Sequence, residues 1–298
     1  MLEADGGARS SRTRLAVRKT YKLYVGGAFP RSESGRSYLV SGAGGQPLAN
    51  FALASRKDVR DAVLAARKAQ PGWASATAYN RGQVLYRAAE MLEGRHAQFA
   101  ATLVAGEGLT FEAASATVDM AVDRLVWYAG WSDKLAQVAG SANPVAGPYF
   151  DFSVPEPTGV VGVLAPQASS LLGLVSVLAP VITSGNAAVV VASEARPLPA
   201  LDLAEVLATS DVPGGVVNIL TGRTAELAPV LAAHRDVDAL DLAGAPDGLD
   251  AQLEEAGAGN VKRVLRRARP GPDWSVEPMP ARMLFFVEVK TVWHPIGV

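Results

Sequence analysis

Between residues 157 and 193 the chain carries no charged residue, and this stretch constrains the fold more than any other feature. Pro166 and Pro180 interrupt it, so it lacks the ~20 continuous apolar residues that a membrane-spanning helix requires. Its valine-rich runs are typical of strands covered on both faces of a parallel sheet. We therefore predict a soluble protein without a membrane partner. The predicted elements are a strand at 159–164, a helix at 169–182 and a strand at 187–191.

Strand and helix patterns keep alternating after this stretch. The further strands are predicted at 215–219, 238–242 and 260–264, and the helices at 197–208, 224–233 and 247–256. This βαβ rhythm indicates an α/β fold, a doubly wound parallel sheet with helices on both faces. Upstream, apolar residues at helical spacing predict helices at 56–70, at 79–103 with a break near Gly94, and at 111–138. Ser55 caps the first of them, and Pro71 is expected to end it.

Composition excludes several classes of function. The net charge of −1 lacks the excess of Lys and Arg that nucleic-acid binding needs, so no nucleic-acid partner is expected. The 298 residues include no cysteine, which excludes disulfides and Cys-based metal sites and fits a reducing, cytoplasmic location. The three histidines are far apart in the sequence, so no metal site is predicted. Residues 1–20 have no sustained apolar run and are expected to form a flexible tail.

Four short motifs follow one another in a set order. They are Tyr-Val-Gly-Gly-Ala-Phe at 24–29, Glu-Pro-Thr-Gly-Val-Val-Gly at 156–162, Gly-Asn-Ala-Ala-Val-Val at 185–190 and Val-Pro-Gly-Gly-Val-Val-Asn at 212–218. This succession resembles the aldehyde dehydrogenase superfamily. The resemblance implies a Rossmann-like cofactor domain with an N-terminal helical arm and a C-terminal oligomerisation strand. The expected parts are a flexible tail at 1–20, an arm and helical part at 21–155, the cofactor-type domain at 156–269, and a linker with the strand at 270–298.

The residues that the family uses for catalysis are replaced. The family relies on a cysteine thiolate as nucleophile, and this chain has no thiol. Ala168 stands where the family has an asparagine that donates to the oxyanion, and losing such a donor costs ~10²–10³ in rate. The family's general-base glutamate aligns with Arg267 or within one residue of it, and an arginine cannot accept a proton. The block that carries the family's catalytic domain is missing between residue 264 and the proline-rich linker. These departures predict a chain without catalytic residues.

The cofactor positions are partly kept. By resemblance, Pro166, Ser193, Glu194 and Gly244 match positions near the family's dinucleotide. The family's ribose-binding lysine is replaced by Val191, and alanines replace the two hydroxyl-bearing residues that flank Gly244. Losing one hydrogen bond to a charged group removes ~1.5–3 kcal/mol. We therefore expect no cofactor, with weak NAD(P) binding as the alternative.

Near the C-terminus, residues 262–269 form a basic run, which predicts a salt-bridged surface, an interface with an acidic partner, or an anion site. Residues 283–293 are rich in β-branched and aromatic side chains and predict one long strand. By resemblance this strand joins a neighbouring subunit, and its expected interface residues are Phe285, Val287, Val289, Val292 and Trp293. These features suggest a non-catalytic subunit that assembles with a catalytic aldehyde dehydrogenase or with itself. The alternative is an NAD(P)-dependent oxidoreductase acting on an aldehyde.

Overall fold

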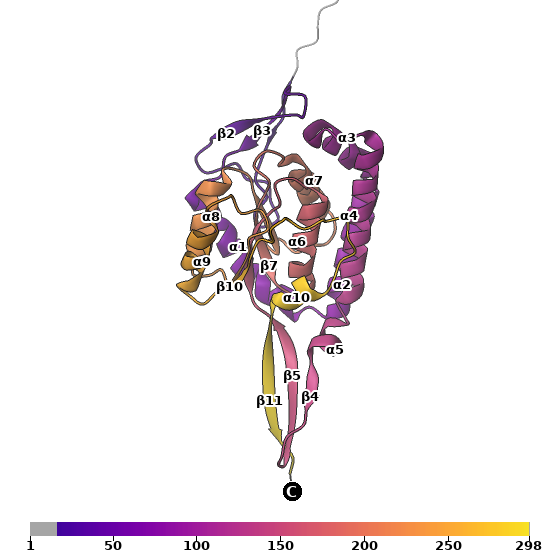
Figure 1. Ribbon diagram of the computed structural model, residues 1–298, viewed down its shortest axis with the longest axis vertical. Helices are drawn as coiled ribbons and strands as arrows, with labels where there is room; N and C mark the ends of the chain where they lie inside the picture. Colours follow the sequence, from indigo (N-terminus) through magenta and orange to yellow (C-terminus); the bar gives the residue numbers. More distant parts are fainter. Residues whose placement is uncertain (1–16, 298) are drawn as a thin grey trace, which may run out of the picture.

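The computed structural model describes residues 17–297 of the chain (Figure 1). The predicted flexible tail at 1–20 therefore lies almost entirely outside the described residues. A five-stranded sheet forms the centre of the molecule, in the order β10-β9-β6-β7-β8, and every neighbouring pair is parallel. The sheet confirms the predicted α/β class. Its strands are β6 (Val160–Leu164), β7 (Ala187–Val191), β8 (Val217–Leu220), β9 (Ala239–Asp241) and β10 (Arg263–Leu265).

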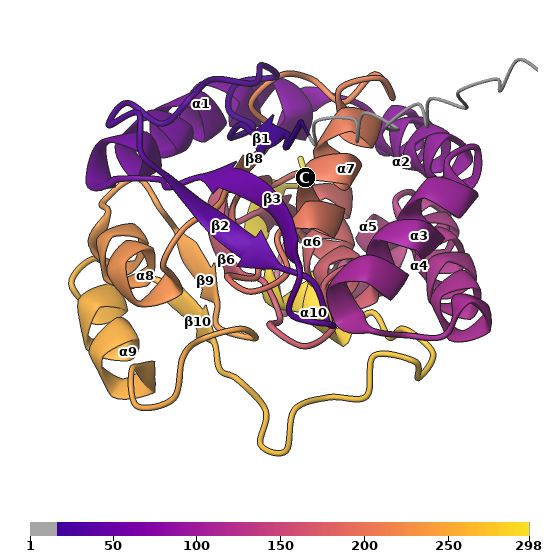
Figure 2. The same cartoon turned by 90° about the horizontal axis from the view of Figure 1, so that it is seen from above.

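Helices cover both faces of this sheet (Figure 2). On one face α1 (Arg56–Ser75) packs beside α8 (Thr224–Ala233), which in turn packs on α9 (Asp250–Ala258). The opposite face carries α6 (Leu172–Thr183) and α7 (Leu198–Leu207). An outer layer of helices packs on these two and is formed by α2 (Ala78–Glu93), α3 (His96–Glu107) and α4 (Phe111–Trp131). Every residue of β6 and β7 is buried, as the valine-rich runs predict.

Two helices differ most from the sequence-based prediction. Helix α1 continues through Pro71 to Ser75, because Trp73 in its last turn is buried and donates from Nε1 to the Ile182 carbonyl at 2.8 Å. This tertiary contact outweighs the tendency of proline to end a helix. The predicted helix at 111–138 is divided into α4 and the short α5 (Leu135–Ala139).

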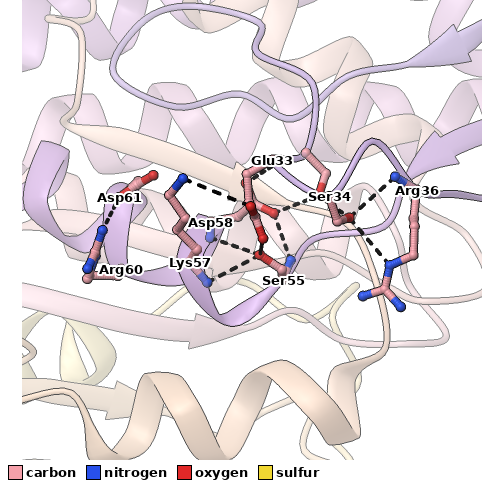
Figure 3. Close-up of polar contacts among 9 residues, drawn as sticks. Glu33, Ser34, Arg36, Ser55, Lys57, Asp58, Arg60 and Asp61 are labelled. Carbon is pink, nitrogen blue, oxygen red and sulfur yellow. Dashed lines mark hydrogen bonds and ion pairs between the residues drawn. The ribbon is translucent and has the colours of Figure 1, made fainter.

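The start of α1 is fixed by a capping box that also holds the preceding loop (Figure 3). The Ser55 hydroxyl accepts from the N–H groups of Lys57 and Asp58, while the Asp58 carboxylate accepts from the Ser55 N–H at 2.7 Å. The same carboxylate accepts from the Ser32 hydroxyl at 2.7 Å and from the Glu33 N–H at 3.1 Å. One buried carboxylate therefore satisfies the helix start and anchors the N-terminal loop.

A second sheet lies at the N-terminal end of the described chain. Its order is β1-β3-β2, with β1 (Thr20–Tyr21) parallel and β2 (Ser37–Ser41) antiparallel to β3 (Pro47–Ala52). These three strands were not predicted from the sequence. Phe51 of β3 is buried and stacks on the ring of Tyr21, with 5.0 Å between the ring centroids.

A third sheet forms an arm that projects from the body of the molecule, with the C-terminus near its far end (Figure 1). Its order is β11-β5-β4, and all pairs are antiparallel. The strands are β4 (Ser141–Asn143), β5 (Tyr149–Pro157) and β11 (Val287–Pro295). The predicted strand over 283–293 is therefore wrong in its first part, because residues 281–285 form helix α10 (Ala281–Phe285).

The C-terminal strand also has a partner within its own chain, which the sequence analysis did not foresee. Val287 lies opposite Pro157, and the register continues until Pro295 lies opposite Tyr149. Of the expected interface residues, Phe285 lies in α10 and packs against the core, and Val287 is buried. By contrast, Val289 and Trp293 are 59% and 58% exposed, and Val292 is half-buried. Of the five expected interface residues, Val289 and Trp293 are therefore the two that are largely exposed.

Candidate functional site at the carboxyl edge of the sheet

A pocket of about 390 Å³ lies where the loops after β6 and β9 diverge. The chain runs from β6 to β7 on one side and returns to β9 on the other, so this is the topological switch point where α/β sheets bind ligands. The pocket brings together Pro166, Ala168, Gly244 and Arg267, four of the predicted site residues. The other two, Ser193 and Glu194, follow β7 and do not line this pocket.

Gly244 is required by the close approach of two loops. Its N–H donates to the Leu164 carbonyl at 2.8 Å. A Cβ at this position would lie 1.8 Å from the carbonyl oxygen of Ala165, a distance that no side chain tolerates. The glycine therefore maintains the contact between the ends of β6 and β9, a packing role that needs no ligand.

Arg267 is engaged in ion pairs and is mostly buried. Its Nη2 lies 2.8 Å from Asp247 Oδ1 and 3.1 Å from Asp250 Oδ2, and its side chain is 17% exposed. The guanidinium has no acceptor atom, so Arg267 itself cannot take a proton. Ala168 is exposed in the same pocket, and its carbonyl accepts from Arg196 Nη1 at 3.0 Å.

Gln167 joins the loops that follow β6 and β7. Its Oε1 accepts from the Glu194 N–H at 2.9 Å, and its Nε2 donates to the Ala165 carbonyl at 3.1 Å. The Ser193 hydroxyl donates to the Gln167 carbonyl at 3.1 Å. The sequence analysis did not single out Gln167, since no motif marks a glutamine that folds back on its own loop. The Gln167 side-chain amide thus forms its hydrogen bonds within the chain.

Both carboxylate oxygens of Glu194 are also engaged. Oε1 accepts from Arg223 Nη1 at 2.6 Å, and Oε2 accepts from the Thr224 N–H at the start of α8 at 3.0 Å. A carboxylate at a helix N-terminus is favoured by the helix dipole. The Tyr38 hydroxyl donates to the Glu194 carbonyl at 3.3 Å, and the Arg223 guanidinium lies over the Tyr38 ring. Burial raises the pKa of Tyr38. This cluster joins β2 to the ends of β7 and β8.

The residues of this edge fit a dinucleotide poorly. Val191 is fully buried and offers no polar group, Glu194 would have to exchange its present partners, and Ala243 has no side-chain donor. The N–H of Ser170, just before α6, is likewise taken by the carboxylate of Glu107 at 2.9 Å. The Ser170 N–H and the Glu194 carboxylate are therefore already hydrogen-bonded within the chain.

The basic run forms ion pairs along its length. Arg263 binds Glu288 and Arg266 binds Glu254, at 2.7 Å and 2.6 Å. Arg267 and Arg269 share Asp250. The ion pairs from Arg263 to Arg269 are those expected of a salt-bridged surface, while an interface with an acidic partner and an anion site stay predictions.

Residues 17–297 contain neither a metal-binding cluster nor a membrane-spanning helix. In this part of the chain no group of three or more His, Asp or Glu side chains is placed to hold a metal ion. No helix in the same range combines the length and the apolar character needed to cross a bilayer.

A doubly wound parallel sheet with its pocket at the switch point defines an α/β protein of the dinucleotide-binding type. Residues 29–266 match the sequence pattern of the aldehyde dehydrogenase family, and the chain belongs to this family. This finding confirms the resemblance that the motifs indicated.

Individual relatives show how much of such proteins the chain represents. It is 31% identical to cytosolic aldehyde dehydrogenase 1 of Elephantulus edwardii, over 85% of this chain and 50% of that protein. It is 30% identical to cytosolic 10-formyltetrahydrofolate dehydrogenase of Mus musculus, over 84% of this chain and 28% of that protein. The chain thus spans about half the length of the first relative and less of the second.

Solved structures have the same fold. An NAD-dependent aldehyde dehydrogenase from Sinorhizobium meliloti superposes with a TM-score of 0.76 and 25% identity, over 83% of this chain and 50% of that one. A 3,6-anhydro-L-galactose dehydrogenase in complex with NADP superposes with a TM-score of 0.78 and 24% identity, over 83% and 51%. At these identities the likeness establishes the Rossmann-like fold.

Proposed function

We propose that this chain is a non-catalytic aldehyde dehydrogenase-like subunit that assembles with and supports a catalytic aldehyde dehydrogenase. One observation carries the proposal: at the carboxyl-edge pocket, the base position is held by Arg267, fixed between Asp247 and Asp250. Ala168 beside it has no side-chain donor, and the sequence has no cysteine to act as nucleophile. Acyl-transfer chemistry of the family's kind needs all three functions.

The proposal includes weak or absent binding of NAD(P). Arg223 and the start of α8 occupy the Glu194 carboxylate, and the chain's own Gln167 satisfies the neighbouring backbone. A dinucleotide would have to break these contacts before forming its own, which reduces the net gain from each new hydrogen bond.

Assembly is proposed to use the projecting arm. Val289 and Trp293 are exposed on β11, and this strand lies at an edge of its sheet with unpaired main-chain groups. An edge strand binds a partner by adding to its sheet. We expect the partner to be a catalytic aldehyde dehydrogenase subunit or a second copy, in the cytoplasm, with no nucleic acid involved.

Two measurements test the proposal. The purified chain should give no NAD(P)H with short, long or aromatic aldehydes, and turnover above a heat-inactivated control would disprove the non-catalytic assignment. Co-expression with a catalytic aldehyde dehydrogenase from the same organism should give a complex on size-exclusion chromatography with light scattering. A chain that stays monomeric, both alone and with that enzyme, would disprove the assembly role.

The alternative function is an NAD(P)-dependent oxidoreductase acting on an aldehyde. It is favoured by Glu194 and Gly244, which remain at the edge of an intact sheet. Calorimetry with millimolar NAD or NADP separates the two. A ligand at a hundredfold excess over its dissociation constant stabilises a protein by about 2.7 kcal/mol, and an effect of that size would favour the alternative.

A further inference from the structure

Residues 270–280, here called the strap, connect β10 to α10 along the outside of the molecule (Figure 2). Most of the strap is exposed, including Val276 at 61% and Met279 at 70%. Trp274, Pro278 and Pro280 are half-buried, and the Trp274 side chain packs against the main core. The strap also forms one wall of the carboxyl-edge pocket through Gly271, Pro272 and Trp274.

A single buried cation holds the middle of the strap. The Nη2 of Arg124, on α4, donates to the carbonyl oxygens of Trp274 and Val276 at 2.8 Å each. Its Nη1 donates to the Ser176 hydroxyl on α6, also at 2.8 Å. Arg124 is 7% exposed, and its three hydrogen bonds go to neutral oxygen atoms.

The buried guanidinium of Arg124 depends on the strap for most of its hydrogen bonds. A buried guanidinium is costly unless its N–H groups are satisfied, and two of the three acceptors belong to the strap. Burial also lowers the pKa of Arg124. If the strap were lifted, the guanidinium would lose these two acceptors but would become accessible to water. Hydrogen bonds to water would then offset part of the lost hydrogen-bond energy.

We propose that the strap is a lid that lifts as one unit, with Arg124 as its latch. Segments with little buried apolar surface and an exposed backbone open at low free energy, whereas α10 beyond the strap stays anchored by the buried Met283. Lifting removes the Gly271, Pro272 and Trp274 wall of the pocket and uncovers Arg124. The position of the strap thus controls access to the carboxyl edge, whatever ligand or partner uses it.

Cleavage between Ser275 and Val276 by thermolysin, which cuts before exposed apolar residues, tests the lid in the full-length chain. The fragment that begins at Val276 is followed by mass spectrometry under conditions where cleavage tracks the open fraction. Arg124→Met should raise the cleavage rate at least tenfold, which corresponds to about 1.4 kcal/mol. Arg124→Lys should give a smaller increase, because one ammonium group replaces a planar fork of donors.

The matched control is Arg87→Met, which removes an exposed arginine paired with Glu90 and should leave the rate unchanged. Trp274→Ala removes the strap's packed ring from a half-buried position and provides a second test if Arg124→Met does not fold. Trp274→Ala should also raise the cleavage rate at least tenfold. Rates within twofold of wild type in the folded variants would overturn the lid, as would wild-type cleavage as fast as that of an unfolded peptide.

Discussion

The Arg282 guanidinium on α10 donates a hydrogen bond to the fully buried carboxylate of Asp241 at the end of β9. The same guanidinium lies over the ring of Trp274, 5.5 Å from its centroid. Burial raises the pKa of Tyr128, which lies near this pair, to about 12, so its phenol stays neutral at physiological pH. This ion pair attaches the C-terminal part of the chain to β9 of the parallel sheet.

Removing Arg282 should therefore be strongly destabilising. Arg282→Met leaves the Asp241 carboxylate buried without its cation, and we expect the free energy of unfolding to fall by about 3–5 kcal/mol. Asp241→Leu combined with Arg282→Met should recover most of this loss, because no charge remains buried. Chemical denaturation of the three proteins measures the effect. A single variant as stable as wild type would contradict the role of the pair.

Gly244 should not tolerate even one added methyl group. In Gly244→Ala the Cβ would lie 1.8 Å from the Ala165 oxygen, so the loops after β6 and β9 must move apart. We expect a loss of about 1–3 kcal/mol or more in thermal or urea unfolding. Gly271→Ala is the control, because a Cβ there meets nothing within 4 Å and should have almost no effect.

Glu288 connects the arm to the parallel sheet and should respond to pH. A bidentate pair with Arg263, at 2.7 Å and 2.9 Å, lowers the pKa of Glu288. The pair therefore stabilises the fold above the unfolded pKa of about 4.3, and this contribution is lost as pH falls through the lower folded value. Because both side chains are partly exposed, the effect should stay below about 1 kcal/mol.

An NMR titration of Glu288 measures this directly. Arg263→Met should raise the pKa of Glu288 toward about 4.3. Arg266→Met is the matched control, since Arg266 binds Glu254 instead. If the pKa of Glu288 is the same in both variants, the pair does not form in solution.

Proline substitutions in β11 should distinguish the side of the strand that pairs with β5 from the side that is expected to pair with another molecule. Neighbouring residues of an antiparallel strand direct their N–H groups to opposite sides, so Val289 and Lys290 differ in which edge they serve. One of Val289→Pro and Lys290→Pro should weaken pairing with β5, and the other should abolish association while the monomer stays folded. Light scattering and circular dichroism give the two readouts. Association that survives both substitutions would exclude β11 as the assembly edge.

The arm also shows where local sequence misleads. Residues 283–286 have strand-forming side chains, yet Met283 and Phe286 are fully buried against the core and belong to α10 and its end. Deleting residues 284–298 would therefore damage the core as well as the arm. A propensity describes a segment in isolation, and burial against the helices of the body outweighs it here.

Among the candidate site residues, Ala168, Val191 and Arg267 could be proposed as replacements from the motifs, since each lies at or shortly after the end of a strand. The hydrogen-bonding partners of the retained residues could not be predicted from the sequence. Nothing near Glu194 in the sequence indicates Arg223 or Tyr38, and nothing near Arg124 indicates the carbonyl groups of the strap.

The sequence by itself determined the class of the fold and the family, because uncharged valine runs, helical spacing and short motifs are local and survive without tertiary contacts. Only the tertiary structure decided that Glu194 meets Arg223, that Asp241 meets Arg282 and that β11 pairs with β5. These contacts join segments far apart in the chain. Their partners are selected by how helices and strands pack around the sheet, which no local pattern encodes.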